Sequence, residues 1–244
     1  MSPSTAYTIG SVLLTSSVAL VCLFVLGWDE QKLRARIPVM IAVTCGVLIG
    51  EAVFHLIPES MRRGMDYGLT AGLVLAGLVF SFLLEVGCKL FLNDSELAPV
   101  ARISLFAESV HNAVDGALIA AAYLTSIRVG LVVTFAIVLH ELPHELGNFS
   151  VLIHAGYGRK KAFLLNLLSA CAALLGALAV LLGGRSLGAY SKYLLPPAAG
   201  CFLYIAVFNL IPDLFKRAEA SRRAILIVGV AVGAAFMLLV TLTR

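Results

Sequence analysis

Charged side chains are scarce in this sequence of 244 residues. Asp, Glu, Lys and Arg make up 13% of it, whereas a soluble globular domain contains about 25%. Hydrophobic residues make up 60%, and the mean hydropathy is +0.98. The shortage of charge leaves no segment in which a soluble domain could fold. We therefore predict an all-α, polytopic integral membrane protein in the plasma (inner) membrane, with residues 1–244 forming a single transmembrane domain.

Cysteines are also few, and none are paired in sequence. The five cysteines are scattered without a C-x-x-C motif, which argues against a disulfide framework and against a thiolate metal site. The first ten residues contain no Lys or Arg, so the basic region of a cleaved secretory signal is missing and we expect the first helix to be retained. Lys and Arg between the apolar segments explain the net charge of +4, and nothing predicts a nucleic-acid partner.

Apolar segments recur along the whole chain, and seven polar or turn-forming breaks divide them into eight predicted transmembrane helices. The breaks lie at residues 28–36, 61–66, 93–102, 125–128, 156–161, 183–192 and 215–223. Of the 18 Lys and Arg residues, twelve belong to the first, third, fifth and seventh loops and six to the opposite side. Because Lys and Arg are enriched in cytoplasmic loops, we predict that both termini lie outside the cytoplasm.

Two of these segments share a motif. Residues 52–59, Ala-Val-Phe-His-Leu-Ile-Pro-Glu, match residues 206–213, Ala-Val-Phe-Asn-Leu-Ile-Pro-Asp, at six of eight positions. The predicted second helix runs outward and the predicted seventh runs inward, which is the pattern of a transporter built from inverted repeats. The alternative is that the match arose by chance, since the tripeptide Leu-Ile-Pro can easily occur twice in so apolar a chain. The carboxylate that ends both copies favours a repeat.

Ionisable side chains concentrate in the fourth and fifth segments, although each buried charge costs roughly a few kcal/mol in lipid. On an ideal helix, one face of the fifth segment spans an arc of about 140° and holds His140, Glu141, His144, Glu145 and Asn148. A face of about 100° on the fourth segment holds Glu108, His111, Asn112 and Asp115. Both faces are expected near mid-membrane. Imidazoles and carboxylates from two facing helices are the ligands of a first-row divalent cation, with zinc foremost.

Other ionisable groups extend away from these two faces and suit a pathway for the ion. The outer set, near the outer end of the second segment, is His55 and Glu59, and Glu51 lies deeper on the same face, where it could relay the ion. The remaining pathway residues are Glu108, Glu145, Asn148, His154 and Asp213. We expect the ion to arrive past the outer set and to leave on the cytoplasmic side. Interfacial capping is the alternative for His55, Glu59 and Asp213, and a hydrogen bond to a neighbouring helix is the alternative for His154.

The fifth segment also contains the zinc protease motif H-E-x-x-H, as His140-Glu-Leu-Pro-His144. In an intramembrane zinc metalloprotease the two histidines would bind zinc, Glu141 would be the general base, and Asp115 could supply a third ligand. Pro143 counts against this alternative, because it should disturb the helix that aligns the two imidazoles. The additional polar groups and the inverted motif also favour a transporter, so the protease remains the alternative.

Two motifs resemble a known family. His111-Asn-Ala-Val-Asp-Gly116 and His140-Glu-Leu-Pro-His-Glu-Leu-Gly147 are similar to the paired signatures of the ZIP (Zrt/Irt-like protein) family of divalent metal transporters, in the branch with a His-Glu-x-Pro-His-Glu motif. The Leu-Ile-Pro motifs also resemble that branch, and the resemblance covers nearly the whole chain. It implies eight helices with both termini outside and transport of zinc, with iron, manganese or cadmium as further substrates, into the cytoplasm.

The resemblance also implies a site for two ions. His111, Asp115, His140 and His144 would hold the first ion, and Asn112, Asp115 and Glu141 would hold or share the second. It further implies a homodimer in the lipid bilayer and alternating access, in which one helix bundle slides against another. The third loop, residues 93–99, contains no histidine, so no cytoplasmic metal-sensing loop is predicted.

Overall fold

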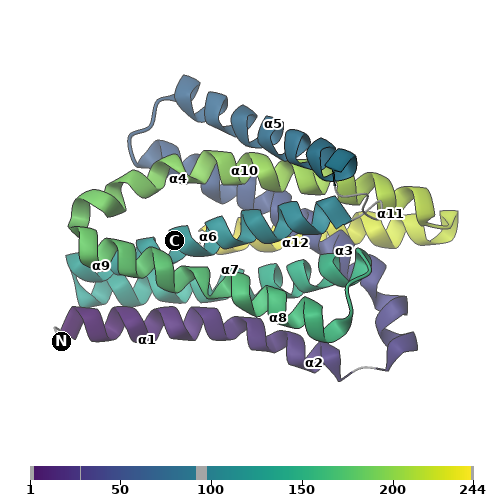
Figure 1. Ribbon diagram of the computed structural model, residues 1–244, viewed down its shortest axis with the longest axis horizontal. Coiled ribbons are helices and arrows are strands. Elements are labelled where there is room, and N and C mark those ends of the chain that lie inside the picture. Colours follow the sequence, from purple (N-terminus) through teal and green to yellow (C-terminus); the bar gives the residue numbers. More distant parts are fainter. Residues whose placement is uncertain (1–2, 28, 92–97, 243–244) are drawn as a thin grey trace.

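The computed structural model describes residues 3–27, 29–91 and 98–242. All regular structure within these ranges is helical, which confirms the predicted all-α class (Figure 1). Most of the predicted third loop, at residues 92–97, lies outside the described residues, and the prediction about metal sensing falls there.

Within the described residues, the chain crosses the molecule in eight helical stretches, several of which change helix type along their length. The first three stretches are α1 (Pro3–Ser17), η1 (Val18–Val21) and α2 (Cys22–Leu26); α3 (Glu30–Gly50), η2 (Glu51–Leu56) and α4 (Ile57–Arg62); and α5 (Tyr67–Phe91). The next three are α6 (Ala98–Thr125); α7 (Ile127–His154); and α8 (Arg159–Ala170) with α9 (Ala172–Tyr190). After η3 (Ser191–Tyr193) come α10 (Leu195–Leu203), η4 (Tyr204–Leu210) and α11 (Ile211–Arg217), and finally α12 (Ala220–Leu242).

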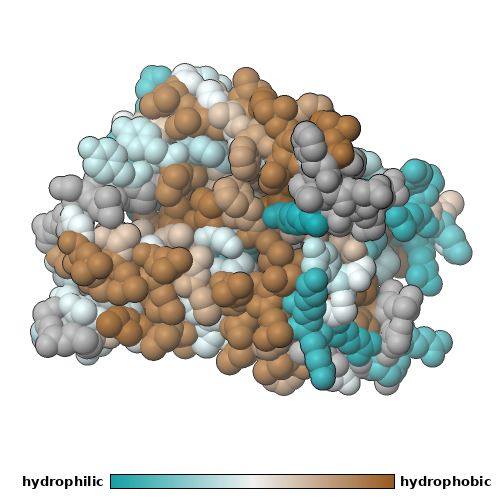
Figure 2. Space-filling model, in the orientation of Figure 1, coloured by the Kyte–Doolittle hydropathy of each residue, from teal (hydrophilic) through white to brown (hydrophobic). Residues whose placement is uncertain are grey.

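Seven of these stretches, within the described residues, are long and apolar enough to cross a membrane. The remaining stretch is α6, which has 28 residues and carries the polar face predicted from the sequence. Its neighbours α7 and α9 pack along it, so its polar residues are covered by protein. The surface that Figure 2 shows is mostly hydrophobic, with hydrophilic residues gathered at the end where Figure 1 places α11. The chain is an integral membrane protein.

The two segments with matching sequence also adopt the same local structure. Each forms a π-helix, η2 or η4, followed by a short α-helix with proline in its first turn. Proline lacks an N–H and its ring clashes with the carbonyl four residues earlier, and the wider π-turn ahead of Pro58 and Pro212 relieves that clash. Figure 1 shows that the path from α3 to α4 runs opposite to the path from α10 to α11. The matching segments are therefore copies of an inverted structural repeat.

Glycines allow each copy of the repeat to pack closely against its own partner helix, at two equivalent crossings. At the crossing of α3 with α12, Gly46 faces Gly233, and a Cβ atom on Gly46 would lie 2.0 Å from a carbonyl oxygen of α12. At the crossing of α10 with α5, Gly200 faces Gly77, and a Cβ atom on Gly200 would lie 2.1 Å from a carbonyl oxygen of α5. Close contact at small residues is a common way for helices to pack in lipid. Gly46 and Gly200 hold the same position relative to the shared motif.

The helices group into two bundles. The first bundle contains α1, α6, α7, α8 and α9, and the second contains α3, α5, α10 and α12 together with the two π-helices. α3 packs against α7, and α10 packs against α6, so the boundary between the bundles follows the two polar helices. The polar faces of α6 and α7 are consequently buried at the middle of the molecule.

Candidate metal centre

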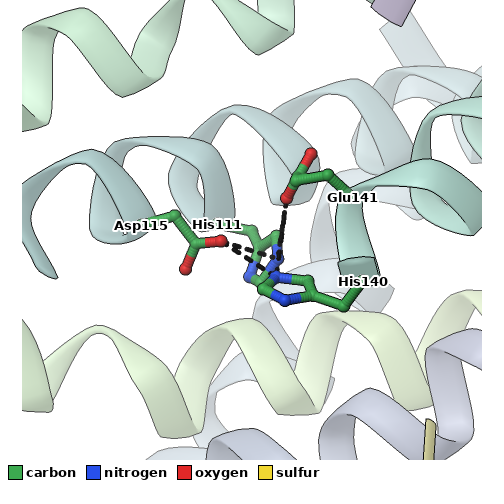
Figure 3. A group of neighbouring side chains, drawn as sticks. All are labelled: His111, Asp115, His140 and Glu141. Carbon is green, nitrogen blue, oxygen red and sulfur yellow. Dashed lines mark hydrogen bonds and ion pairs between the residues drawn. The ribbon is translucent and has the colours of Figure 1, made fainter. Parts of the chain in front are cut away.

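The polar faces of α6 and α7 meet at the boundary between the bundles. His111 and Asp115, one turn apart on α6, lie opposite His140 and Glu141 on α7 (Figure 3). Each of these four residues is at most 3% exposed. One ligand atom from each lies within 4.8 Å of the others, which is close enough for one cation to contact all four.

Imidazole nitrogens and carboxylate oxygens alternate around this centre. Nε2 of His140 lies 2.9 Å from Oδ2 of Asp115 and 3.6 Å from Oε1 of Glu141. Nε2 of His111 lies 3.8 Å and 3.5 Å from the same two oxygens. Two nitrogens and two oxygens form the mixed set of ligands that zinc takes in proteins.

The hydrogen bonding of the centre is incomplete. Neither ring nitrogen of His111 and neither carboxylate oxygen of Glu141 has a hydrogen-bond partner, and all four atoms are buried. Each unpaired buried polar atom costs about 1–3 kcal/mol, and a charged one costs more. A divalent cation would satisfy these atoms together, so a metal accounts for the arrangement better than a structural hydrogen-bond network does.

The helix itself orients the ring of His140. Nδ1 of His140 lies 3.1 Å from the carbonyl oxygen of Ala136, one turn earlier on α7, and donates its proton there. Nε2 lies 2.9 Å from Oδ2 of Asp115, and when a metal replaces the proton of that contact the lone pair of the neutral ring is on Nε2. Metal-binding histidines usually donate the second ring N–H to a carbonyl or carboxylate in this way. His140 is therefore oriented to bind a metal through Nε2.

The other two predicted ligands differ in their placement. The ring of His144 lies 5.1 Å from that of His111, centroid to centroid, and its Nδ1 lies 3.5 Å from Oε2 of Glu108. The amide nitrogen of Asn112 instead donates to the backbone carbonyl of Glu108, at 3.0 Å. The structure thus brings His144 to the edge of the centre and turns the amide nitrogen of Asn112 onto its own helix.

A group of three carboxylates lies beside the centre. Oxygens of Glu108, Glu141 and Glu145 lie within 4.8 Å of one another, and all three residues are buried. Glu108 and Glu145 each have one oxygen without a hydrogen-bond partner. Three buried carboxylates cannot all be charged at this spacing unless a cation lies among them. From the sequence, Glu108 and Glu145 are predicted only as pathway residues. The position of a residue along its own helix does not show which carboxylates of different helices lie close together.

Asn148 belongs to a polar network that joins three helices. Its Oδ1 accepts a hydrogen bond from Ser104 at 2.9 Å, and its Nδ2 donates to Asn166 at 2.7 Å. Asn166 also donates to the carboxylate of Glu145. These bonds join α6, α7 and α8, and both the amide oxygen and the amide nitrogen of Asn148 take part in them.

His55 and Glu59 line a cavity of about 500 Å³ between α4 and the ends of α6 and α7, and Glu51 is not part of its lining. His55 and Glu59 line one side, and apolar residues of α6 and α7 line the other. Glu59 forms ion pairs with Arg63 at 2.7 Å and with Arg62 at 3.6 Å, which fits capping at the end of its helix. His55 is 3% exposed, so the lining includes a buried side chain of a type that can bind a metal.

The inner pathway residues lie at the other end of the molecule. His154 lines two cavities, of about 560 Å³ and 640 Å³. Its Nε2 lies 2.7 Å from Oδ2 of Asp213 on α11, and Arg217 donates to the other oxygen of Asp213 at 2.7 Å. The contact from His154 to a neighbouring helix is therefore present, as the alternative for this residue predicts.

Pro143 does not interrupt α7, which continues as one helix from Ile127 to His154. The prediction that Pro143 disturbs the helix between His140 and His144 is wrong. Neighbouring helices hold the backbone in place, as they do for many prolines within membranes. The argument against a protease that depended on a disturbed helix therefore no longer holds.

Comparisons with known proteins agree with the motifs. The sequence model described as ZIP Zinc transporter matches residues 92–241, which include α6 and α7. The zinc transporter ZIP13 of Pongo abelii is 32% identical over 203 residues, which cover 75% of this chain and 60% of that protein. The ZIP13 homolog of Drosophila melanogaster is 38% identical over 172 residues, or 65% and 48% of the two chains. The zinc transporter SLC39A7 of Rattus norvegicus is 34% identical over 155 residues, or 61% and 33%. The chain thus spans less than two thirds of the length of these curated relatives.

Proposed function

The chain belongs to the ZIP zinc transporter family, and from this premise we propose that it carries divalent metal cations, zinc foremost, across the membrane into the cytoplasm. The proposal extends to cadmium, iron(II) and manganese as further substrates, and to a homodimer in the plasma (inner) membrane with residues 1–244 as one transmembrane domain. The observation that carries it is the buried centre on α6 and α7, where four ligand atoms from His111, Asp115, His140 and Glu141 converge.

Two ions fit the arrangement of ligands. The first would bind to His111, Asp115 and His140, beside Glu141. The second would bind among the carboxylates of Glu108, Glu141 and Glu145, so that Glu141 bridges the ions. The first ion has imidazole ligands, whereas the second has only oxygen ligands. The affinity for zinc is therefore lower at the second position, because imidazole is the better ligand for this ion. Release toward the cytoplasm is thereby favoured.

An aromatic side chain of the second bundle covers the centre. The ring of Phe202 on α10 lies 5.5 Å from that of His111 and 5.4 Å from that of His144, between centroids. It keeps water from these rings. Because Phe202 and the histidines belong to different bundles, displacement of one bundle along the other would uncover the rings, which supports alternating access as the mechanism.

The metalloprotease is the less favoured function. A catalytic zinc site has about three protein ligands and one open position. The centre and the adjoining carboxylates together offer more ligands than one such ion requires. The relatives are named as zinc transporters, and the inverted repeat has a role in a carrier but none in a protease.

Metal uptake into proteoliposomes tests the proposal. Wild-type protein should take up zinc, and His140→Ala and Asp115→Ala should each lower the rate by about a hundredfold or more, since each removes a ligand of the first ion. Cadmium, manganese and iron(II) are measured in parallel. Ser109→Ala is the matched control on α6, because its hydroxyl bonds only to the carbonyl of Leu105 in the same helix, and it should transport like wild type.

Absence of uptake by the wild type would contradict transport. If that protein also cut a membrane peptide, and if Glu141→Gln stopped the cleavage, the metalloprotease would replace the transporter. Uptake that survives both His140→Ala and Asp115→Ala would contradict the position of the site.

A further inference from the structure

A third group of metal-binding side chains lies between the outer cavity and the centre. It consists of Glu51 and His55 on η2 and His140 on α7. One ligand atom of each lies within 4.8 Å of the others, and all three residues are buried. The first two residues belong to the second bundle and the third belongs to the first bundle.

We propose that Glu51, His55 and His140 form an outer metal site, which takes a zinc-like cation from the outer cavity and passes it to the centre. This proposal rests on the proposed transport function. In this proposal Glu51, His55 and His140 bind one ion together. Glu51 and His55 are then ligands of the same ion and not separate positions along a pathway.

The pair on η2 is already arranged as a metal ligand and its support. Nδ1 of His55 is hydrogen-bonded to Oε1 of Glu51, so this nitrogen carries the ring proton and Nε2 carries the lone pair. A carboxylate that holds the second nitrogen of a histidine is a recurrent feature of metal sites. Oε2 of Glu51 is buried and has no hydrogen-bond partner. A cation beside it would remove the cost of this unpaired oxygen.

His140 lies between this group and the centre. The centroid of its ring is 5.5 Å from that of His55 and 5.4 Å from that of His111. An ion can therefore exchange its partners on either side while it stays close to one imidazole. Because His140 and His55 belong to different bundles, an ion held by both links the bundles together.

The outer cavity leads to the proposed site. Its lining includes His55 and also Ala136, whose carbonyl orients the ring of His140. Two imidazoles and one carboxylate favour zinc or cadmium over magnesium and calcium, which prefer oxygen ligands alone. The site would thus select among divalent cations before they reach the centre.

The second copy of the repeat shows which substitutions the fold accepts. In η4, Asn209 occupies the position of His55, and Ile205 occupies that of Glu51, yet the π-helix is the same. His55→Asn therefore removes the proposed ligand with a side chain that this turn already accommodates. Glu51→Gln keeps the shape of the side chain and removes its charge. Asn209→Leu is the matched control in the second copy.

Zinc bound to the purified full chain is counted first, by equilibrium dialysis in detergent followed by elemental analysis. His55→Asn and Glu51→Gln should each bind one zinc fewer per chain than wild type. Asp115→Asn should lose zinc from the centre and keep the outer ion. Unchanged zinc in both η2 variants, each eluting from size exclusion like wild type, would overturn the outer site.

Uptake kinetics then separate the two proposals. The η2 variants should raise KM for zinc by at least about tenfold, as for loss of a metal-site partner, and should leave maximal uptake within about twofold. Asn209→Leu should match wild type. If wild type moves no metal, transport fails while the zinc count still decides the outer site. If wild type moves zinc and the η2 variants keep its KM and zinc count, only the outer site fails.

Discussion

The two copies of the inverted repeat have the same backbone and different chemistry. Both contain a π-helix ahead of a proline, and both cross a partner helix at a glycine. In the first copy η2 presents Glu51 and His55 beside the centre, whereas in the second copy Phe202 covers it. The same fold thus carries ligands on one side of the centre and an apolar cover from the other. The symmetric backbone of the two copies suits the movement of alternating access, and their unequal side chains give the transport a direction.

The carboxylates that end the two copies differ in the same manner. Glu59 pairs with Arg62 and Arg63 within its own short helix. Asp213 contacts His154 on α7 and so links the second bundle to the first. The first carboxylate stabilises an end of a helix, while the second fastens two bundles. Matching sequence positions therefore need not have matching roles.

Replacing the crossing glycines tests the shared backbone most severely. Gly46→Ala and Gly200→Ala should each destabilise the protein by about 1–3 kcal/mol or more, because each added Cβ would lie about 2 Å from a carbonyl oxygen. Thermal unfolding in detergent measures the effect. Gly72→Ala, where nothing lies within 4 Å of the added atom, is the control. If one crossing tolerates alanine and the other does not, the two copies are not equivalent.

Acidifying the outer solution tests the unequal chemistry. An imidazole must be neutral to bind a metal, and imidazoles titrate near pH 6.5, so protons compete with zinc as the pH falls. Uptake at a low zinc concentration should decrease by about tenfold between pH 7.5 and pH 5.5. Initial rates in proteoliposomes acidified only on the outside provide the measurement.

The variant His55→Asn sharpens this comparison, since it gives η2 the residue that η4 has. Its uptake should fall less steeply with acidification than that of wild type, because one competing imidazole is gone. A profile that stays flat or rises in wild type would contradict histidines as primary ligands, or would indicate coupling to protons.

The smallest effect is expected at the inner contact. Asp213→Asn weakens the link between His154 and α11, and a partly exposed ion pair contributes up to about 1 kcal/mol. Maximal uptake should change by no more than about fivefold, with KM for zinc unchanged. Arg217→Gln, which removes the other partner of Asp213, is the companion variant. A large rise in KM would place Asp213 among the metal ligands instead.

The sequence predicted most of the fold because length and hydropathy act within one helix at a time. The eight helical stretches and the inverted motif follow from such local patterns. The π-helices were not predicted, since a proline inside a helix can produce a kink, a break or a wider turn. Pro58 and Pro212 follow π-turns, while Pro143 leaves α7 uninterrupted, and only the packing around each proline distinguishes them.

The candidate site, like the fold, was predicted where it depends on the pattern within a single helix. Helical periodicity placed His111 and Asp115 on one face and His140 and Glu141 on another, and the structure brings these faces together. Periodicity does not give the rotation of one helix relative to its neighbour. For that reason the sequence does not predict that Glu51 approaches His140 across the boundary between the bundles. It shows only that both residues are polar.

The single available lone pair of His140 has a further consequence. Nδ1 is committed to the carbonyl of Ala136, so the ring can serve only one ion at a time through Nε2. The outer site and the centre therefore compete for this nitrogen, and filling one weakens the other. Zinc binding should be negatively cooperative, with an isotherm broader than that of independent sites. An arriving ion would then lower the affinity for the ion ahead of it and help to drive that ion onward.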